Sequence, residues 1–322
     1  MQISVVTPTY YRYKEVPGLL ESLARQTNLP NEIILVDGAP LQEKRTEEWV
    51  KTNKDIFPFK IKYYRKTGGT AIQRNYGINK VNGQLIAFID DDVRLAPDFF
   101  KHIVSYFNKD TLNQIGGITG YKTSHSFNME NRARWRWYRR LRLLSTFTPS
   151  AYDRKTGYPI NAGAQPFFKG VREVDIMTSA CTVYRKEIFT ELNFHPFFRD
   201  YGMLEDNHLA LKCKKAGYKN LQCGDAHCEE LNATSGRSNS FIIGQKTCLN
   251  YYFVFNDIEG PLSLKQKLRF FSFQFFELFR FGFAALKHPE KKRLNYLLGK
   301  SSGIYIALFR WNYYCHKILN PN

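Results

Sequence analysis

The amino-acid sequence predicts an α/β fold with a doubly wound, mostly parallel sheet and a C-terminal helical extension. Over residues 1–110, short apolar runs that end in turn residues alternate with segments of helical periodicity. The run Leu85–Ile89 is apolar throughout, which is typical of a strand buried on both faces of a parallel sheet. It ends in three consecutive carboxylates, Asp90, Asp91 and Asp92, at the edge where open α/β sheets bind their ligands.

Strands and helices are expected to alternate along the first part of the chain. The strands are the runs Gln2–Val6, Glu32–Val36, Lys60–Tyr64, Leu85–Ile89 and Ile115–Tyr121. The helices are Glu15–Gln26, Leu41–Thr52, the segment after Gly68 and Gly69, and a segment that begins near Pro97. Right-handed crossovers place the carboxyl ends of the parallel strands at one edge. We therefore expect the loop Thr7–Tyr10, Asp37 and Asp90–Asp92 to converge there.

The second part of the chain adds further elements. A strand is expected over Glu173–Tyr184, a helix over Met203–Tyr218 that stops at Gly217, and a strand over Asn220–Cys223. Thr148–Phe168 is rich in Pro, Gly and Asn without periodicity, which predicts a long loop.

Composition limits the class of partner. The 322 residues are 43% hydrophobic, enough for a sizeable core, and carry a formal net charge of +18. That charge indicates an anionic partner: nucleic acid, an acidic membrane surface or a phosphorylated substrate. The six cysteines show no paired framework, which favours reduced thiols in the cytosol. No leader sequence and no run of about 20 uncharged apolar residues is present, so we expect neither a signal peptide nor a transmembrane helix.

The three adjacent carboxylates, Asp90–Asp92, predict a metal site. Three acids at one strand end repel one another unless a cation lies among them, and oxygen ligands without thiolates suit Mg²⁺ or Mn²⁺. Such an ion in turn suits a diphosphate. A solvated acidic turn before a helix is the structural alternative. The chain has no Walker loop and no GxGxxG after its first strand, and its first loop lacks the Gly-rich, Arg-containing signature of sugar nucleotidyltransferases.

Five motifs in order resemble those of the family 2 glycosyltransferases, which are inverting enzymes with the Rossmann-like GT-A fold. They are VVTPTYYR, LVDGAP, AIQRNYGI, LIAFIDDDVRLAPDF and LEDNHLALKCKKAGY, and they cover residues 1 to about 230. The resemblance implies a nucleotide-diphosphate-sugar donor, such as a UDP-sugar, and Mn²⁺ or Mg²⁺. It also implies a nucleotide-sugar-binding half (1–120) and an acceptor-binding and catalytic half (121–260), and composition marks residues 261–322 as a basic aromatic helical extension.

The resemblance assigns roles to matching residues. The donor-binding set is Thr7, Pro8, Thr9, Tyr10, Asp37, Arg74, Asp90 and Asp91. Within it, Asp37 would accept a hydrogen bond from the base, and Arg74 would lie near the base or a phosphate. Asp92 would bind the metal, with Asp90 at the metal or the ribose and Asp91 as the variable middle position. His227 would complete the metal shell, although a lone histidine is often structural.

The pair Glu205 and Asp206 is assigned to catalysis. Inverting transfer needs one carboxylate within reach of the acceptor hydroxyl. By the resemblance, Asp206 is that base and Glu205 positions the acceptor. The structural alternative is that both acids stabilise a helix N-terminus. Lys212 and Lys214 stand where the family often has an arginine, so a phosphate contact there is in doubt.

Two segments are expected to contact anionic partners. Arg132–Arg142 combines arginines with Trp135, Trp137 and Tyr138, which suits nucleic acid, a phosphorylated or lipid-linked acceptor, or a merely solvated helix. Leu262–Leu286 combines Lys and Arg with eight phenylalanines, which favours an amphipathic helix on an anionic membrane surface. Packing on the catalytic domain or dimerisation is the alternative, and the sequence sets no oligomeric state.

These observations lead to one functional hypothesis. We expect a metal-dependent inverting glycosyltransferase that moves a sugar to a glycan or lipid-linked acceptor in cell-surface polysaccharide or glycolipid synthesis. It would be peripheral on the cytoplasmic face of the cell membrane. A nucleic-acid-binding protein on an α/β scaffold is the alternative, but uncompensated carboxylates would repel phosphate, so no nucleic-acid partner is expected.

Overall fold

The computed structural model describes residues 1–125, 132–233 and 238–320. Its elements group into two compact units, which are described separately. The first unit comprises Met1–Phe127, Ala162–His195 and Glu205–Gly236, and the second comprises Asn128–Asn161, Pro196–Leu204 and Arg237–Asn322.

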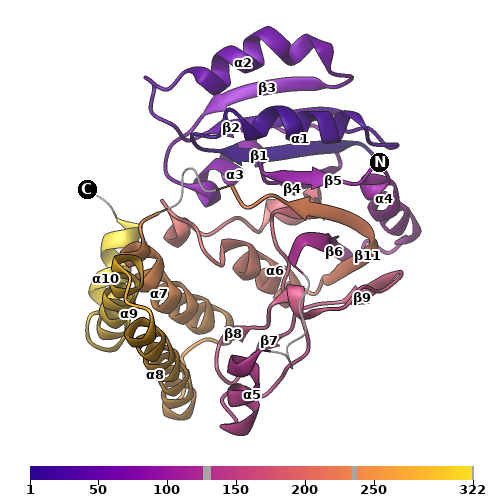
Figure 1. Ribbon diagram of the computed structural model, residues 1–322. Helices are drawn as coiled ribbons and strands as arrows, with labels where there is room; N and C mark the ends of the chain where they lie inside the picture. Colours follow the sequence, from indigo (N-terminus) through magenta and orange to yellow (C-terminus); the bar gives the residue numbers. More distant parts are fainter. Residues whose placement is uncertain (126–131, 234–237, 321–322) are drawn as a thin grey trace. The chain divides into compact units, whose positions relative to one another are not determined.

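A mixed sheet forms the centre of the first unit (Figure 1). Its strand order within the described residues is β3-β2-β1-β4-β10-β6-β11-β5, and β9 pairs with β11. The bounds are β1 (Ile3–Thr9), β2 (Glu32–Asp37), β3 (Lys60–Arg65), β4 (Leu85–Ile89), β5 (Val93–Leu95), β6 (Ile115–Lys122), β9 (Val171–Glu173), β10 (Cys181–Arg185) and β11 (Lys219–Glu230). Strands β1 to β4 run parallel, whereas β10 runs antiparallel between β4 and β6. The predicted α/β fold is confirmed; parallel pairing joins β1 to β4 and β6 to β11, whereas β10, β5 and β9 pair antiparallel with their neighbours.

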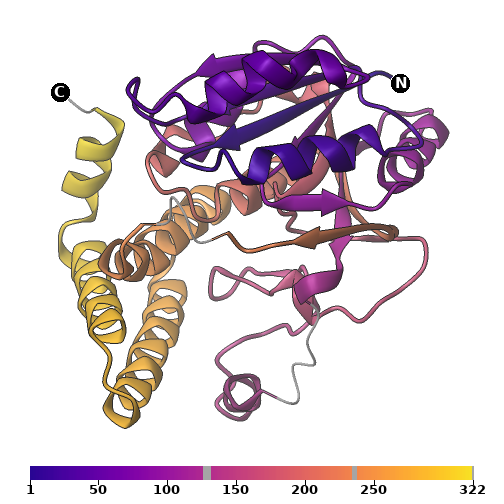
Figure 2. The same cartoon turned by 45° about the horizontal axis from the view of Figure 1, so that its top comes forward.

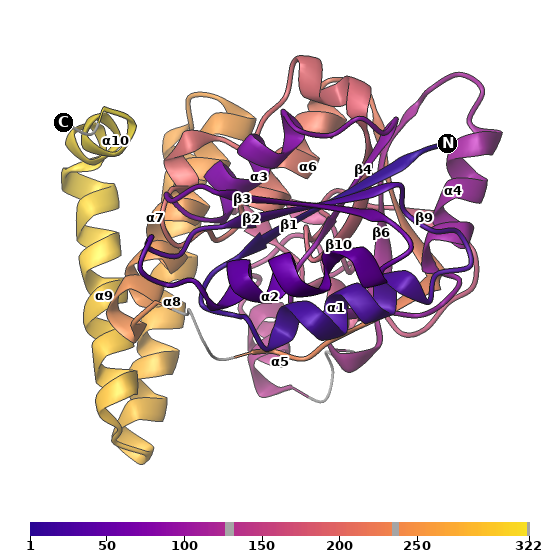
Figure 3. The same ribbon diagram turned by 90° about the horizontal axis from the view of Figure 1, so that it is seen from above.

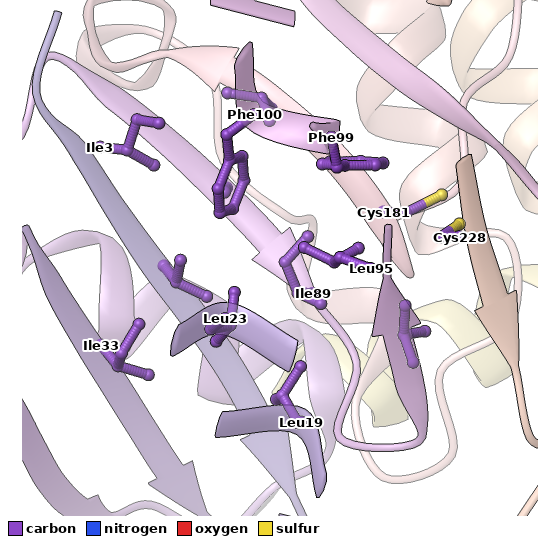
Figure 4. Packing of buried hydrophobic residues seen from close by; sticks show 14 of the residues in the cluster. Ile3, Leu19, Leu23, Ile33, Ile89, Leu95, Phe99, Phe100, Cys181 and Cys228 are labelled. Carbon is purple, nitrogen blue, oxygen red and sulfur yellow. The ribbon is translucent and has the colours of Figure 1, made fainter. Parts of the chain in front are cut away.

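Helices cover both faces of this sheet (Figure 3). They are α1 (Glu15–Ala24), α2 (Arg45–Asn53), α3 (Thr70–Ile78), α4 (Phe99–Lys109) and α6 (Glu205–Lys215). On one face, Leu19 and Leu23 of α1 pack with Ile3, Ile33 and Ile89 of the strands (Figure 4). On the other face α3 lies close to the strands, because a Cβ on Gly77 would overlap Val6 and approach Val36. Successive side chains of a strand point to opposite faces, and helices cover both faces. The strands are therefore buried on both sides, as the apolar runs predicted.

Several predicted boundaries are wrong, for local reasons. The strand expected over Glu173–Tyr184 is split into β9 and β10, with an irregular segment between them. The helix expected over Leu41–Thr52 begins only at Arg45, where the Glu43 carboxylate accepts the Arg45 backbone N–H. The strand expected over Asn220–Cys223 continues to Glu230, so His227 lies inside β11 rather than after it.

The second unit is mainly helical (Figure 2). Its elements are α5 (Ala133–Arg140), β7 (Tyr152–Asp153), β8 (Tyr158–Pro159), α7 (Ser240–Glu259), α8 (Leu264–Lys287), α9 (Lys291–Phe309) and α10 (Trp311–Leu319). Short 3₁₀ turns occur across both units, at Lys54–Ile56, Thr123–His125, Ala162–Ala164, Lys186–Thr190 and Pro196–Phe198. Helices α7 and α9 approach closely because Gly244, Gly299 and Gly303 leave no room for a Cβ between them.

Helix α8 divides its aromatic side chains between a core and the surface. Phe270 and Phe271 are buried with Tyr252 and Phe255 of α7. By contrast, Phe275, Phe279 and Phe283 are 40%, 75% and 62% exposed. Some of the aromatic side chains expected to face a membrane over Leu262–Leu286 are therefore covered by α7 and α9. Among the described helices, none is both long and apolar enough to cross a membrane.

Candidate functional site

The predicted convergence of strand ends is confirmed on the carboxyl edge of the sheet. Thr9 is the last residue of β1 and pairs in register with Asp37, the last residue of β2. The Thr9 hydroxyl donates a 2.8 Å hydrogen bond to Oδ2 of Asp91, which follows β4. Gln73 of α3 donates from its side-chain amide to the backbone carbonyls of Thr9, at 2.9 Å, and Val36, at 2.6 Å. One α3 side chain therefore fixes the ends of β1 and β2 against each other.

The loop predicted to bind the donor is largely buried. Thr7 and Pro8 lie inside β1, and Thr9 is 3% exposed. Tyr10 is 43% exposed and packs edge-on against Tyr11, with ring centroids 4.6 Å apart. Of the predicted loop Thr7–Tyr10, Tyr10 is exposed, and Tyr11, which follows it, is exposed as well.

Asp37 has no exposed surface. Its Oδ1 accepts the Ala39 backbone N–H at 2.8 Å, and its Oδ2 accepts the Tyr63 hydroxyl at 2.8 Å. Burial, and then the hydrogen bond to Asp37, raises the pKa of Tyr63, which keeps this phenol protonated and donating. The carboxylate thus fixes the turn after β2 and the Tyr63 side chain. Because Asp37 is fully buried, a direct hydrogen bond to a base would require neighbouring groups to move.

The carboxylates Asp91 and Asp92 share one arginine. Arg12 Nη1 lies 2.8 Å from Asp91 Oδ1 and 3.0 Å from Asp92 Oδ2. Asp92 Oδ2 also accepts the Ala233 backbone N–H at 2.9 Å. Burial raises the pKa of Asp91 to about 7, and the Arg12 charge opposes that rise. Sequence reasoning missed Arg12, although it stands within the first motif, VVTPTYYR.

Asp90 is joined to Glu205 through Arg74. Arg74 Nη2 lies 2.9 Å from Asp90 Oδ1, and Nη1 lies 2.8 Å from Glu205 Oε1. Glu205 also accepts the Thr70 hydroxyl at 3.0 Å. The Arg74 side chain is 4% exposed and lies 5.4 Å from the centroid of the Phe194 ring. Arg74 therefore connects Asp90, which is predicted to bind the donor, with Glu205, which is predicted to position the acceptor.

Asp206 lies in the first turn of α6, beside Glu205. Its Oδ2 accepts the Ser179 backbone N–H at 3.2 Å, and its Oδ1 accepts that of Asn207 at 2.7 Å. Burial, and then the charge of Glu205, raises the pKa of Asp206 to about 6, whereas Arg74 lowers it. This carboxylate is ionised at pH 7 and is a stronger proton acceptor than an exposed aspartate.

The residues predicted to hold a metal fit it in chemistry but not in arrangement. Asp90 and Asp92 offer carboxylate oxygens. His227 Nε2 is buried and has no hydrogen-bond partner among the described residues, while its ring lies 6.0 Å from that of Tyr121. Within residues 1–125, 132–233 and 238–320, however, no three His, Cys, Asp or Glu side chains are close enough to hold an ion. The Asp92 carboxylate forms its ion pair with Arg12 instead.

The basic tract Arg132–Arg142 is partly a structural element of the second unit. Trp135 and Tyr138 of α5 are buried, and the Tyr138 hydroxyl donates to Glu277 of α8 at 2.7 Å. Trp137 is 49% exposed. Two of the three aromatic side chains in this tract are therefore unavailable for stacking on a base or a sugar.

The family assignment rests on sequence comparison. The family described as "Glycosyl transferase family 2" matches residues 4–192, more than half of the chain, and the chain belongs to this family. A curated relative, the O-antigen chain rhamnosyltransferase RfbN of Salmonella typhimurium, is 27% identical over 229 residues. That match covers 70% of this chain and 65% of the relative, so the chain spans less than two thirds of the relative's length.

Solved structures support the fold. The Staphylococcus aureus protein TarS (residues 1–349), in complex with UDP-GlcNAc, matches with a TM-score of 0.57 at 14% identity, over 95% of this chain and 81% of that one. The mannosyltransferase PcManGT of Pyrobaculum calidifontis, in complex with GDP-Man and Mn²⁺, matches with a TM-score of 0.53 at 16% identity, over 99% and 85%. The GT-A fold expected from the motifs is confirmed.

Proposed function

We propose that this chain is a metal-dependent inverting glycosyltransferase that moves a sugar from a nucleotide-diphosphate donor, such as a UDP-sugar, to a glycan or lipid-linked acceptor. The observation that carries the proposal is the Arg74 bridge between Asp90 and Glu205, beside Asp206. A transferase must bring its donor and acceptor within bonding distance. The Arg74 guanidinium contacts both carboxylates and would therefore fix the distance between the donor-binding and acceptor-binding residues.

Asp206 is the proposed base. It would accept the proton of the acceptor hydroxyl as that oxygen attacks the anomeric carbon from the side opposite the diphosphate. Its pKa of about 6 leaves it ionised at neutral pH while keeping it basic enough to accept a proton. Glu205, held by Arg74 and Thr70, would receive a hydrogen bond from another hydroxyl of the acceptor and so orient it.

Asp92, Asp90 and His227 are the proposed ligands of Mn²⁺ or Mg²⁺. An ion held by these residues would supply positive charge to a departing diphosphate. The presence of Mn²⁺ and GDP-Man in PcManGT supports this proposal. Tyr10 and Tyr11 provide an exposed aromatic surface beside Thr9 for the base of the nucleotide.

A thermal-shift screen of nucleotide-diphosphate sugars, with and without Mn²⁺, tests the donor. A ligand that binds only the folded state stabilises it by RT ln(1 + [L]/Kd), about 2.7 kcal/mol at one hundred times Kd. We expect at least one donor to raise the Tm, and to do so more strongly with Mn²⁺. If no donor raises the Tm at millimolar concentration, the proposal fails.

We further propose that α8 and α9 bind the anionic inner face of the cell membrane. Exposed apolar side chains follow α8 at helical spacing: Leu264, Leu268, Phe275, Phe279, Phe283 and Leu286. Helix α9 carries a second exposed set: Leu294, Leu298, Tyr305, Leu308 and Phe309. Basic side chains at Lys265, Lys267 and Arg269 are also exposed. Basic attraction with apolar insertion is the usual basis of interfacial binding.

A further inference from the structure

The positive charge of the chain is concentrated in the second unit. This unit holds 22 of the 47 Lys and Arg residues but only seven of the 29 Asp and Glu residues. Its formal charge is therefore +15, whereas that of the first unit, which carries the candidate site, is +3. A surface with one sign of charge attracts partners of the opposite sign. We therefore expect the anionic partner that the net charge indicates to bind the second unit.

Helix α5 lies in the most arginine-rich tract of this unit and is fixed by its inner face. Trp135 and Tyr138 are buried. The Tyr138 hydroxyl donates to Glu277 of α8 at 2.7 Å. The Tyr138 ring also lies 5.2 Å from that of Phe273 and 5.9 Å from that of Phe276, both on α8. Helix α5 is thus held against α8 (Figure 1), and these contacts set the position of its outer face.

The outer face of α5, formed by Arg136, Trp137 and Arg140, is basic. Arg136 and Arg140 are one helical turn apart and both are exposed, and Trp137 is 49% exposed. The Arg140 guanidinium lies 5.8 Å from the centroid of the Trp137 ring. The sequence has no acidic residue from Arg132 to Tyr152, and like charges four positions apart destabilise a helix. An anion that binds both arginines would relieve this repulsion.

This outer face adjoins the exposed apolar side chains of α8. Phe276, which contacts Tyr138, is half-buried. Phe279 and Phe283 follow Phe276 by three and seven positions, so they lie on the same side of α8, and both are largely exposed. Basic and apolar side chains therefore border each other on one unit. An anionic bilayer binds this combination, whereas a nucleic acid would use only the charge.

We propose that the outer face of α5 binds the phosphate groups of anionic phospholipids, beside the apolar side chains of α8. The guanidinium fork matches phosphate oxygens, and tryptophan favours the boundary between headgroups and acyl chains. The inference rests on the proposed membrane contact of α8 and assigns the recognition of anionic lipid to a separate element. Binding should therefore require anionic lipid because of α5, even though α8 contributes apolar contact.

Co-sedimentation of the full chain with vesicles tests this, with phosphatidylcholine alone and with phosphatidylcholine and phosphatidylglycerol mixed. A basic side chain near an anionic surface changes partitioning about fivefold, so Arg136→Gln/Arg140→Gln should bind the mixed vesicles about thirtyfold more weakly than the wild type. The difference should shrink at high salt, because screening weakens the attraction. The matched control, Lys54→Gln/Lys60→Gln, removes two charges from exposed positions of the first unit and should sediment as the wild type does. Both double variants should keep the wild-type Tm.

Tryptophan fluorescence tests the contact without a change of charge. With brominated phosphatidylcholine in the mixed vesicles, we expect quenching of the wild-type emission. Trp137→Phe should lose most of this quenching, because Trp135 beside it is buried. Trp49→Phe, in the first unit, is the control and should keep the quenching.

The outcomes separate the inference from the other proposals. It is overturned if Arg136→Gln/Arg140→Gln sediments as the wild type does, if it loses no more binding than the lysine control, or if Trp137→Phe keeps full quenching. It is also overturned if the arginine variant loses affinity for a single-stranded DNA oligomer but not for mixed vesicles, because the face then binds nucleic acid.

The phenylalanines of α8 provide the remaining comparison. If Phe275→Ser/Phe279→Ser/Phe283→Ser still sediments while the arginine variant does not, the inference holds and the proposed contact of α8 fails. If the wild type sediments with neither kind of vesicle, both membrane proposals are overturned. The proposed glycosyl transfer is tested separately, by the thermal-shift screen.

Discussion

Replacing Arg74 by methionine should destabilise the first unit and raise the pKa of the proposed base, Asp206, because the Arg74 charge lowers that pKa. The guanidinium is 4% exposed, and its partner Glu205 is 9% exposed. Removing one member of a buried ion pair costs about 3–5 kcal/mol, because the other charge stays buried without compensation. For a domain of 150–250 residues, this corresponds to a fall in Tm of roughly 6–20 °C. Asp90 adds less to the loss, since its side chain is 31% exposed and can be hydrated.

The double variant Arg74→Met/Glu205→Gln is the decisive control. It removes both charges while the new amide still accepts the Thr70 hydrogen bond, so we expect at least half of the lost stability to return. Differential scanning calorimetry of the wild type, both single variants and the double variant measures the coupling. If Arg74→Met melts within 1 °C of the wild type, or the double variant melts below Arg74→Met, the bridge does not stabilise the fold as argued.

Other substitutions test the remaining roles. Asp206→Asn should keep donor affinity but slow transfer by several orders of magnitude, because it removes proton acceptance with little change in shape; loss of donor affinity with unchanged turnover would refute the role. The rate constant of wild-type transfer should rise with pH around an apparent pKa of about 6, set by Asp206, and a flat profile between pH 5 and 8 would contradict this. The pKa of Asp206 is raised in the folded state, so its contribution to stability is largest below pH 4 and is lost as the pH rises through 6. The Tm of Asp206→Asn should therefore rise relative to that of the wild type between pH 4 and pH 8. Replacing Phe275, Phe279 and Phe283 with Ser should abolish sedimentation with anionic vesicles at an unchanged Tm. The control Leu41→Ser/Ile56→Ser/Leu112→Ser, which removes three exposed apolar side chains from the first unit, should sediment as the wild type does. Equal retention of both triple variants would exclude α8 as the membrane contact.

The sequence predicted the sheet well because its signals are local. An apolar run that ends in Asp37 or Asp90 marks both a strand and its carboxyl edge, and topology then brings such ends together. The pair Glu205 and Asp206 was placed at the start of a helix by the local pattern, but its role came only from the resemblance to the family motif. The family was indicated by five motifs in the right order, because no single motif is specific enough to identify it.

The contacts between these elements were not predictable. Arg12 is separated from Asp91 and Asp92 by about 80 residues, and no periodicity relates ion pairs across a fold. The complete burial of Asp37 depends on Tyr63 of a neighbouring strand. Likewise, the composition of α8 showed that it is aromatic, but which phenylalanines remain exposed depends on α7 and α9. For this reason Phe271, which is buried, is unsuitable as a probe of membrane binding, whereas Phe283 is suitable.

Release of nucleoside diphosphate from a panel of nucleotide-diphosphate sugars, measured with Mn²⁺ and with chelator, tests the central claim most directly. We predict that the wild type turns over at least one donor in the presence of Mn²⁺, and that Asp92→Ala, although folded, releases no nucleotide above background. Turnover of no donor, or equal turnover by Asp92→Ala or in excess chelator, would contradict a metal-dependent glycosyl transfer at this edge of the sheet.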